Sequence, residues 1–306
     1  MLFIISLLSF VAIHSAPNSF VLGGELNPSM TPEAIEKLQA IYGVNKPLLS
    51  QYIDWIQNIL TLNFGVSFVS GKEVSEVIAQ RVGLTLFLNI TTLFVVFSLS
   101  LYLGIESALA FQKKKDYFIQ QLSLFSFSMP SFYLALLMLL LFSVNLQWLP
   151  LAGLHSLEEK EGISYYLDML WHLLLPLGVM IFVSVGTMII YIRSLTLEIL
   201  KSDYYFFALS RDLPKKKLLY DFIVPNLLPP LITMLGLSVP SLIGGSVILE
   251  SIFGLDGMGQ LFYMSAVSRD YPVIMGILMI SAFLTLVGNI VADLILLKIN
   301  PHMLKR

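Results

Sequence analysis

Side chains that could do chemistry are most concentrated between Arg193 and Asn226. This interval contains six of the 18 Lys and Arg residues of the chain, and apolar stretches long enough to cross a bilayer flank it on both sides. Two short helical patterns meet inside it at Asp212-Leu213-Pro214. The chemistry that such an interval offers is recognition, because a charged pair of helices between two membrane helices is a place where a soluble partner can push on a membrane protein.

No catalytic or nucleotide-binding pattern accompanies this interval. The chain of 306 residues has no Cys, which excludes disulfides, thiolate metal sites and cysteine nucleophiles. It contains no G-x-x-x-x-G-K-[ST] phosphate-binding loop, and its four His residues are too scattered to form a zinc-binding helix. The sequence therefore predicts no enzymatic activity, no metal site and no cofactor within this chain. If the chain takes part in active transport, the energy must come from another subunit.

The composition predicts an all-α polytopic membrane protein. Hydrophobic residues make up 57% of the chain and charged residues only 12%, with a mean hydropathy of +0.82. A soluble domain carries about 25% charged residues, which this chain lacks. Five apolar stretches are long enough to span a bilayer. We predict transmembrane helices at residues 84–109, 117–148, 173–192, 227–249 and 273–297.

The apolar segment 1–16 is short for a membrane span, and it lacks the basic residues that begin a signal peptide. We interpret it as the outer part of a first transmembrane helix whose beginning is missing, which brings the expected number of helices to six. A signal peptide and an amphipathic anchor are the alternatives. Prolines should kink or bend two of the full spans, at Pro130 and at Pro229, Pro230 and Pro240.

Residues 17–83 are predicted to form a folded loop domain that lies against the membrane. Thr31-Pro32-Glu33 has the pattern of a helix start, with a capping residue, a proline in the first turn and an acid. Apolar side chains then repeat with the spacing of an amphipathic helix at Tyr52, Trp55, Ile56 and Ile59.

The distribution of Lys and Arg predicts the orientation of the chain. Twelve of these 18 residues lie in the loop 112–116, in the Arg193–Asn226 interval and at the chain end. An excess of Lys and Arg in short loops marks the cytoplasmic side. We therefore expect both termini, with the tail 299–306, to be cytoplasmic, and the outer side to hold residues 17–83, 150–168 and 251–272.

Polar residues are scarce in the middle of the spans. None of the five full spans has an Asp, Glu, Lys, Arg or His in its central two-thirds, although an ion-coupled carrier normally binds its coupling ion there. Asn89 and Asn289 are the deepest polar residues. Either hydrogen bonding between helices or contact with a transported substrate would explain them.

The Arg193–Asn226 interval predicts two helices joined by a tight turn. Ser202-Asp203 is suited to begin the first helix. Asp212 is a tolerable residue in a turn that needs positive φ, although Gly would adopt it more easily. Pro214 suits the first position of the second helix, which Pro225-Asn226 should end at the membrane.

This interval resembles the cytoplasmic loop of the inner-membrane permease subunits of ABC importers, specifically of the dipeptide/oligopeptide/nickel permease family. The family pattern is D-Y-x-x-x-A-x-A-x-G-L, followed by a basic second helix and N-x-L-x-P. The residues that match it in register are Asp203, Tyr204, Ala208, Ser210, Leu213, Asn226, Leu228 and Pro230. Asp212 stands where the family has Gly, and the basic N-terminal start that is usual in the family is absent.

Further motifs extend the resemblance over nearly the whole chain. The outer-loop pattern E-T-x-F-x-x-P-G-x-G is similar to the segment containing Glu250, Phe253, Gly257 and Gly259. The pattern R-D-Y-P-x-x-x-G before the last helix is matched by Arg269, Asp270, Tyr271, Pro272 and Gly276. Asn63-Phe64-Gly65-Val66-Ser67 fits the outer loop domain of the family, and Met129-Pro130-Ser131-Phe132 fits its third helix.

The resemblance implies that the first helix of the interval is a coupling helix, which docks into a groove on a cytoplasmic ATP-binding subunit. Small side chains at Ala208 and Ser210 would allow that close approach, and Lys215–Lys217 would form a basic flank. The coupling residues implied in this way are Asp203, Tyr204, Ala208, Ser210, Arg211, Asp212, Leu213, Pro214 and Asn226.

The resemblance also implies partners and a transport cycle. The partners would be a second homologous permease, two subunits that bind ATP and Mg, and an extracytoplasmic solute-binding protein, with no role for nucleic acid. The scarcity of His and carboxylate ligands in the spans favours di- or oligopeptides as the substrate over nickel. A nickel chelate would need no such ligands. A passive channel or secondary carrier is the alternative from another class.

Overall fold

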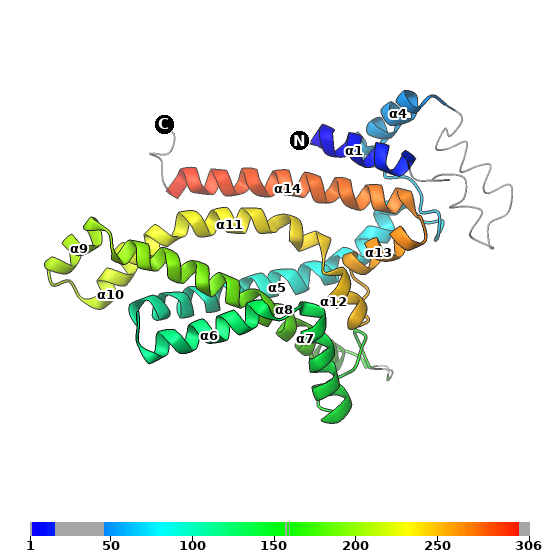
Figure 1. Ribbon diagram of the computed structural model, residues 1–306. Helices are drawn as coiled ribbons and strands as arrows, with labels where there is room; N and C mark the ends of the chain where they lie inside the picture. Colours follow the sequence, from blue (N-terminus) through cyan, green and yellow to red (C-terminus); the bar gives the residue numbers. More distant parts are fainter. Residues whose placement is uncertain (1, 16–45, 157, 159, 300–306) are drawn as a thin grey trace. The chain divides into compact units, whose positions relative to one another are not determined.

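The computed structural model describes residues 2–15, 46–156, 158 and 160–299. Within these residues every regular element is a helix (Figure 1), apart from one isolated antiparallel bridge between Val66 and Glu73. An apolar chain in lipid must satisfy its backbone N–H and C=O groups internally, and helices do this within one segment. The predicted helix start at Thr31-Pro32-Glu33 and residues 300–306 of the predicted tail lie outside the described residues.

Among the described residues, four helices are long and apolar enough to cross a membrane. A fifth span is counted if one bent pair of helices is taken as a single span. The four are α5 (Val74–Leu109), α8 (Ile163–Leu200), the helical stretch Lys215–Val239, and α14 (Tyr271–Ile299). The N-terminal helix α1 (Leu2–Ser15) has 14 residues, short of the roughly 20 that a span requires. Six spans were predicted, and the described residues contain four or five.

The predicted kink at Pro130 is a sharp break. Helix α6 (Lys114–Ser128) ends before it, and α7 (Ser131–Met138) continues into the π-helical segment η1 (Leu139–Asn145). The two helical arms make an angle of 97°. Met129 has extended backbone angles, with φ −83° and ψ 121°, because the ring of a following proline excludes the helical conformation. The stretch predicted as one span kinked at Pro130 is thus bent at that proline, as a broken span or a re-entrant loop.

The helix after the charged interval does not end at Pro225-Asn226 as predicted. α10 (Lys215–Lys217) passes into the π-helical η2 (Leu218–Ile223) and then into α11 (Val224–Gly244). Proline has no N–H, so Pro225 cannot donate the usual helical hydrogen bond. The π-helical segment just before it has hydrogen bonds between residues i and i+5 instead. The side-chain amide of Asn226 donates to the carbonyl oxygen of Phe222 at 2.6 Å. The π turn and this hydrogen bond allow the helix to continue past Pro225.

The chain divides into two compact units, each with its own packing. The first contains residues 1–86, 240–250 and 256–287, and the second contains residues 87–239, 251–255 and 288–306. In the first unit, the amphipathic helix α4 (Leu48–Leu60) packs on α1 and α14 through a cluster of aromatic and apolar residues. Its members are Phe10, Tyr52, Phe68, Tyr271 and Met275, with Trp55 and Ile56 against them. The predicted amphipathic face is confirmed at these three positions of α4.

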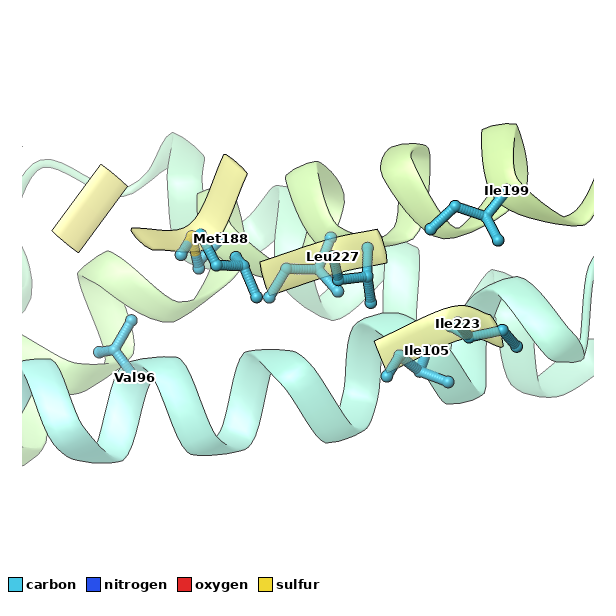
Figure 2. Packing of buried hydrophobic residues seen from close by; sticks show 8 residues of the cluster. Val96, Ile105, Met188, Ile199, Ile223 and Leu227 are labelled. Atoms are coloured by element: carbon cyan, nitrogen blue, oxygen red, sulfur yellow. The ribbon is translucent and has the colours of Figure 1, made fainter. Parts of the chain in front are cut away.

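The core of the second unit joins α5, α8, η2 and α11. Its buried residues are Val96, Ile105, Met188, Ile192, Ile199, Ile223, Leu227 and Leu231, most of which are seen in Figure 2. Because lipid is as apolar as these side chains, close van der Waals contact is what favours the packed state. Gly104 of α5 permits such contact, since a Cβ atom there would lie 2.8 Å from the side chain of Ile192.

Candidate functional site

The charged interval folds into a helical hairpin that comprises α9 (Asp203–Ser210), a turn at residues 211–214, and α10 (Figure 1). The hydroxyl of Ser202 accepts a hydrogen bond from the backbone N–H of Tyr205 at 3.4 Å, and Asp203 lies in the first turn. Both features stabilise a helix N-terminus, where N–H groups are unsatisfied and the dipole is positive. The helix therefore starts where the sequence predicted. We call the segment Asp203–Lys217 the α9–α10 hairpin.

The turn of this hairpin forms around Asp212. Its φ angle is 54°, in the left-handed region, and its N–H donates to the carbonyl of Leu209 at 3.0 Å. Asp is among the few non-glycine residues that adopt this conformation at modest cost. Pro214 directly precedes the second helix, and its carbonyl accepts from the N–H groups of Lys217 and Leu218. The turn thus keeps the conformation predicted for it without the glycine.

The outer surface of α9 is apolar and aromatic. The exposed fractions are 43% for Tyr204, 70% for Phe206, 66% for Phe207 and 52% for Leu209. An exposed apolar patch of this kind marks an interaction surface. Ala208 is only 1% exposed, so it faces its own chain rather than a partner. The predicted approach of another protein at Ala208 therefore needs correction, whereas Ser210, Arg211 and Asp212 are exposed and Leu213 is half-buried.

The hairpin and the segment η2 that follows it pack on the core of the second unit. Leu218 and Ile223 are buried, and Ile223 belongs to the cluster that includes Ile199 of α8 and Leu227 of α11. The side chain of Tyr205 packs against the same cluster. Figure 2 shows Ile199 and Ile223 among the side chains of this cluster. Packed side chains therefore connect α9 with helices α8 and α11.

In the first unit, Glu250 of α12 (Val247–Ile252) is a buried carboxylate with only neutral hydrogen-bond donors among its hydrogen bonds. Its side chain accepts from the Thr85 hydroxyl at 3.2 Å and from the backbone N–H of Gln260 at 2.9 Å. The Thr85 oxygen in turn accepts from the N–H of Met258 at 2.8 Å. Burial raises the pKa of the Glu250 carboxyl above its ordinary value, and the hydrogen bonds oppose this only in part.

Glycines surround the Glu250 carboxylate. A Cβ atom at Gly257 would lie 2.6 Å from Glu250 Oε2, and one at Gly259 would lie 2.7 Å from the backbone nitrogen of Val247. Gly245, which the sequence analysis did not single out, has a φ of 62°, and a Cβ atom there would overlap Glu250 Oε1. The spacing of acid and glycines in this motif therefore has a steric reason, because the backbone folds tightly around the carboxylate.

The other predicted outer motif is also structural in its local contacts. Asp270 is 2% exposed and accepts from the Ser67 hydroxyl at 2.5 Å and from the backbone N–H of Phe68 at 3.0 Å. It thus joins the segment before α5 to the start of α14, where Tyr271 and Pro272 are buried. Within the second unit, Phe253 is buried and its carbonyl accepts from the N–H of Gly153 at 2.9 Å.

The two asparagines considered for a substrate path lie in helices of the second unit. Asn89 is in α5 and Asn289 is in α14, and both side chains are half-buried. A role in binding substrate stays a prediction for both.

Two protein families match this chain. The family described as "Binding-protein-dependent transport system inner membrane component" matches residues 82–305. The family described as "Binding-prot-dependent transport system membrane comp, N-term" matches residues 1–89. Together the two matches cover almost the whole sequence.

Individual relatives carry names from peptide transport. The oligopeptide transport system permease protein AppB of Bacillus subtilis (strain 168) is 35% identical over 302 residues, covering 97% of this chain and 93% of the relative. A putative peptide permease protein of Brucella ovis is 32% identical over 305 residues, covering 99% and 94%. The peptidoglycan transport system permease protein YejB of Agrobacterium fabrum is 29% identical over 279 residues, covering 89% and 76%. This chain therefore belongs to the family of inner-membrane components of binding-protein-dependent transport systems, and it is a multi-pass membrane permease of the ABC transporter type.

Proposed function

We propose that this chain is a permease subunit of an ATP-driven importer of di- or oligopeptides, and that it forms the membrane path together with a second homologous permease. The observation that carries the proposal is the α9–α10 hairpin. Its short helix α9 exposes three aromatic side chains, Tyr204, Phe206 and Phe207, and the other side of this helix packs on the apolar core of the second unit. The names of the relatives support peptides as the transported class.

In this proposal, α9 docks into a groove on a cytoplasmic ATP-binding subunit. Aromatic side chains dominate the affinity of such contacts, and a buried aromatic residue at the centre of an interface contributes about 2 kcal/mol or more. Two such subunits would bind ATP and Mg and hydrolyse the ATP, so that this chain performs no catalysis itself. Their closure would move α9, and the core around Ile223 would pass the movement to α8 and α11.

The remaining partner is an extracytoplasmic solute-binding protein, which would deliver the peptide to the outer loops. The distribution of Lys and Arg supports a cytoplasmic position for the hairpin and for both termini. The exposed basic run Lys215–Lys217 lies beside α9 and would complement an acidic rim on the ATP-binding subunit.

Replacement of the two most exposed aromatics tests the docking surface. The Phe206→Asp and Phe207→Asp variants should abolish peptide uptake and prevent co-purification of the ATP-binding subunits with the permease, because each places an unpaired charge in an apolar contact. Phe206→Leu, which keeps an apolar side chain, is the matched control and should retain most of the uptake. Full uptake by both Asp variants would contradict the docking role of α9.

An uptake assay tests the substrate class. A strain without this gene should fail to accumulate labelled di- or oligopeptides, and the restored gene should recover uptake. Uptake of nickel and of a nickel chelate, measured in the same strains, should be unchanged. Loss of nickel uptake alone would overturn the peptide assignment. Peptide flux that persists after removal of the ATP-binding subunits would instead indicate a passive channel or a secondary carrier.

A further inference from the structure

A buried ion pair in the second unit connects α8 with the turn between α5 and α6. Arg193 of α8 donates from Nε to Asp116 Oδ1 at 2.7 Å and from Nη2 to Oδ2 at 2.8 Å. The Asp116 side chain is 1% exposed and that of Arg193 is 15% exposed. This two-pronged geometry fixes the direction as well as the distance of the contact, because the guanidinium and the carboxylate are both planar.

The same carboxylate organises the α5–α6 turn. Asp116 accepts from the Ser107 hydroxyl at 2.6 Å and from the backbone N–H of Gln112 at 3.0 Å. The guanidinium of Arg193 lies over the ring of Phe111, 5.6 Å from its centroid. A single side chain of α8 is therefore linked to the end of α5, to the turn and to the first turn of α6. We call these five residues the Arg193 clamp.

The clamp lies close to the hairpin along the chain. α8 continues without interruption from Arg193 to Leu200, and α9 begins three residues later, at Asp203. Seven residues of α-helix correspond to about 10 Å. About two turns of α8 and the two linking residues Lys201 and Ser202 therefore separate Arg193 from α9.

Stability alone does not explain an ion pair at this place. Well-packed apolar residues often stabilise a protein core as well as a buried ion pair does, since removing two charges from water is costly. A buried polar pair has another consequence, because it permits one register between two elements and penalises sliding. The apolar contacts of α8 with α5, such as Ile192 with Ile105 in their shared cluster, lack this directionality.

We propose that Arg193 and Asp116 are positioning residues for energy coupling: they make the α5–α6 turn move together with α8 when α9 is displaced. The inference rests on the proposed function, since it assumes that a partner pushes on α9. An exposed ion pair between Lys115 and Glu106 offers a comparison at the same turn, with side chains 53% and 35% exposed. This pair joins α5 to α6 across the turn and includes no residue of α8.

The test uses the complete importer, with its ATP-binding subunits and binding protein, reconstituted in liposomes. The double variant Asp116→Asn/Arg193→Met removes both charges, and the amide oxygen keeps an acceptor for the N–H of Gln112 while the Ser107 hydroxyl can turn to accept from the amide NH2. Peptide uptake and ATP hydrolysis are measured in the same vesicles. We expect hydrolysis close to that of the wild type and a ratio of uptake to hydrolysis that is lower by about tenfold. Lys115→Ala, the matched control, should leave the ratio unchanged.

Two milder variants test the inference if the double variant does not assemble into the importer in the liposomes. Arg193→Lys retains a charge but not the two-pronged geometry, and Ser107→Ala removes one contact of the carboxylate. Each should lower the ratio by about twofold to fivefold. An unchanged ratio per assembled complex would overturn the inference, because it would assign the clamp a purely structural role. A wild-type complex that hydrolyses ATP without importing peptide would contradict the proposed function instead.

Discussion

Asp116 and Glu250 are both buried carboxylates, but the two units satisfy them in different ways. Asp116, 1% exposed, meets the full positive charge of Arg193 together with two further donors. Glu250, 3% exposed, takes its hydrogen bonds from a hydroxyl and from backbone N–H groups, and a ring of glycines encloses it. The first arrangement depends on one oppositely charged side chain. The second depends on neutral donors and on the shape of the backbone around the carboxylate.

The difference predicts two kinds of sensitivity. An ion pair fails when either member is lost, because the other charge stays buried without compensation. A carboxyl held by dipoles tolerates the loss of one donor better, but it can give up its charge by binding a proton. Asp116 should therefore respond to substitution of its partner, and Glu250 should respond to pH and to any side chain placed among its glycines.

The largest effect is expected when the ion pair is broken from one side. Asp116→Ala leaves the guanidinium of Arg193 buried without an anion, which should destabilise the fold by about 3–5 kcal/mol. The double variant Asp116→Asn/Arg193→Met should recover most of this loss, because no charge then remains. The thermal unfolding midpoint of the purified permease in lipid nanodiscs measures both. If the single variant were as stable as the wild type, the pair would not be buried as described.

A slightly smaller effect is expected from side chains placed around Glu250. Gly245→Ala puts a Cβ atom against the carboxylate at a residue whose φ is 62°. The left-handed conformation alone costs a non-glycine residue about 1–2 kcal/mol, and the overlap adds to it. Gly83→Ala is the matched control in the same unit, because a Cβ atom there meets nothing within 4 Å. The two unfolding midpoints should differ clearly, and equal midpoints would show that the carboxylate is not enclosed.

The pH dependence separates the two carboxylates further. Burial raises the folded-state pKa of Glu250 above its ordinary value of 4.5. Below the ordinary value the carboxyl is protonated in both the folded and the unfolded state, so its burial is fully tolerated. As the pH rises through the raised pKa, the folded state must hold a buried charge and stability is lost. Glu250→Gln should flatten the part of the stability curve that lies above the ordinary pKa of 4.5. Parallel curves for the two proteins would contradict the prediction.

Local features could be predicted from the sequence, whereas features that depend on packing between distant residues could not. The start of α9 at Ser202-Asp203 and the turn at Asp212 were predicted because capping and turn preferences are local properties of a few residues. The apolar spans were located because the bilayer demands long apolar segments. The position of the bend at Pro130 was predicted, but its angle of 97° was not, since that angle depends on what packs around it.

Contacts between distant residues were out of reach of the sequence analysis. Asp116 and Arg193 are 77 positions apart, and the sequence shows only one acid among three lysines and one arginine at the edge of a span. The burial of Ala208 was missed for a related reason. Both faces of α9 carry apolar side chains, so periodicity does not reveal which face meets the core. Gly245 gave a weak signal, as one of two adjacent glycines before Glu250.

Asp212 is a third carboxylate, and unlike Asp116 and Glu250 it is exposed. We expect the smallest effect on stability when it is replaced. Its charge is hydrated, so only its backbone conformation matters, with a φ of 54°. Asp212→Gly removes the steric cost of that conformation but increases the freedom of the unfolded chain, so stability should change by less than about 0.5 kcal/mol. Asp212→Val should cost about 1–2 kcal/mol, because a branched side chain does not tolerate positive φ. Peptide uptake should follow the same order, with Gly equal to the wild type and Val impaired. A loss of uptake with Gly would show that the Asp212 carboxylate itself contacts a partner, which would move it from a turn residue to a docking residue.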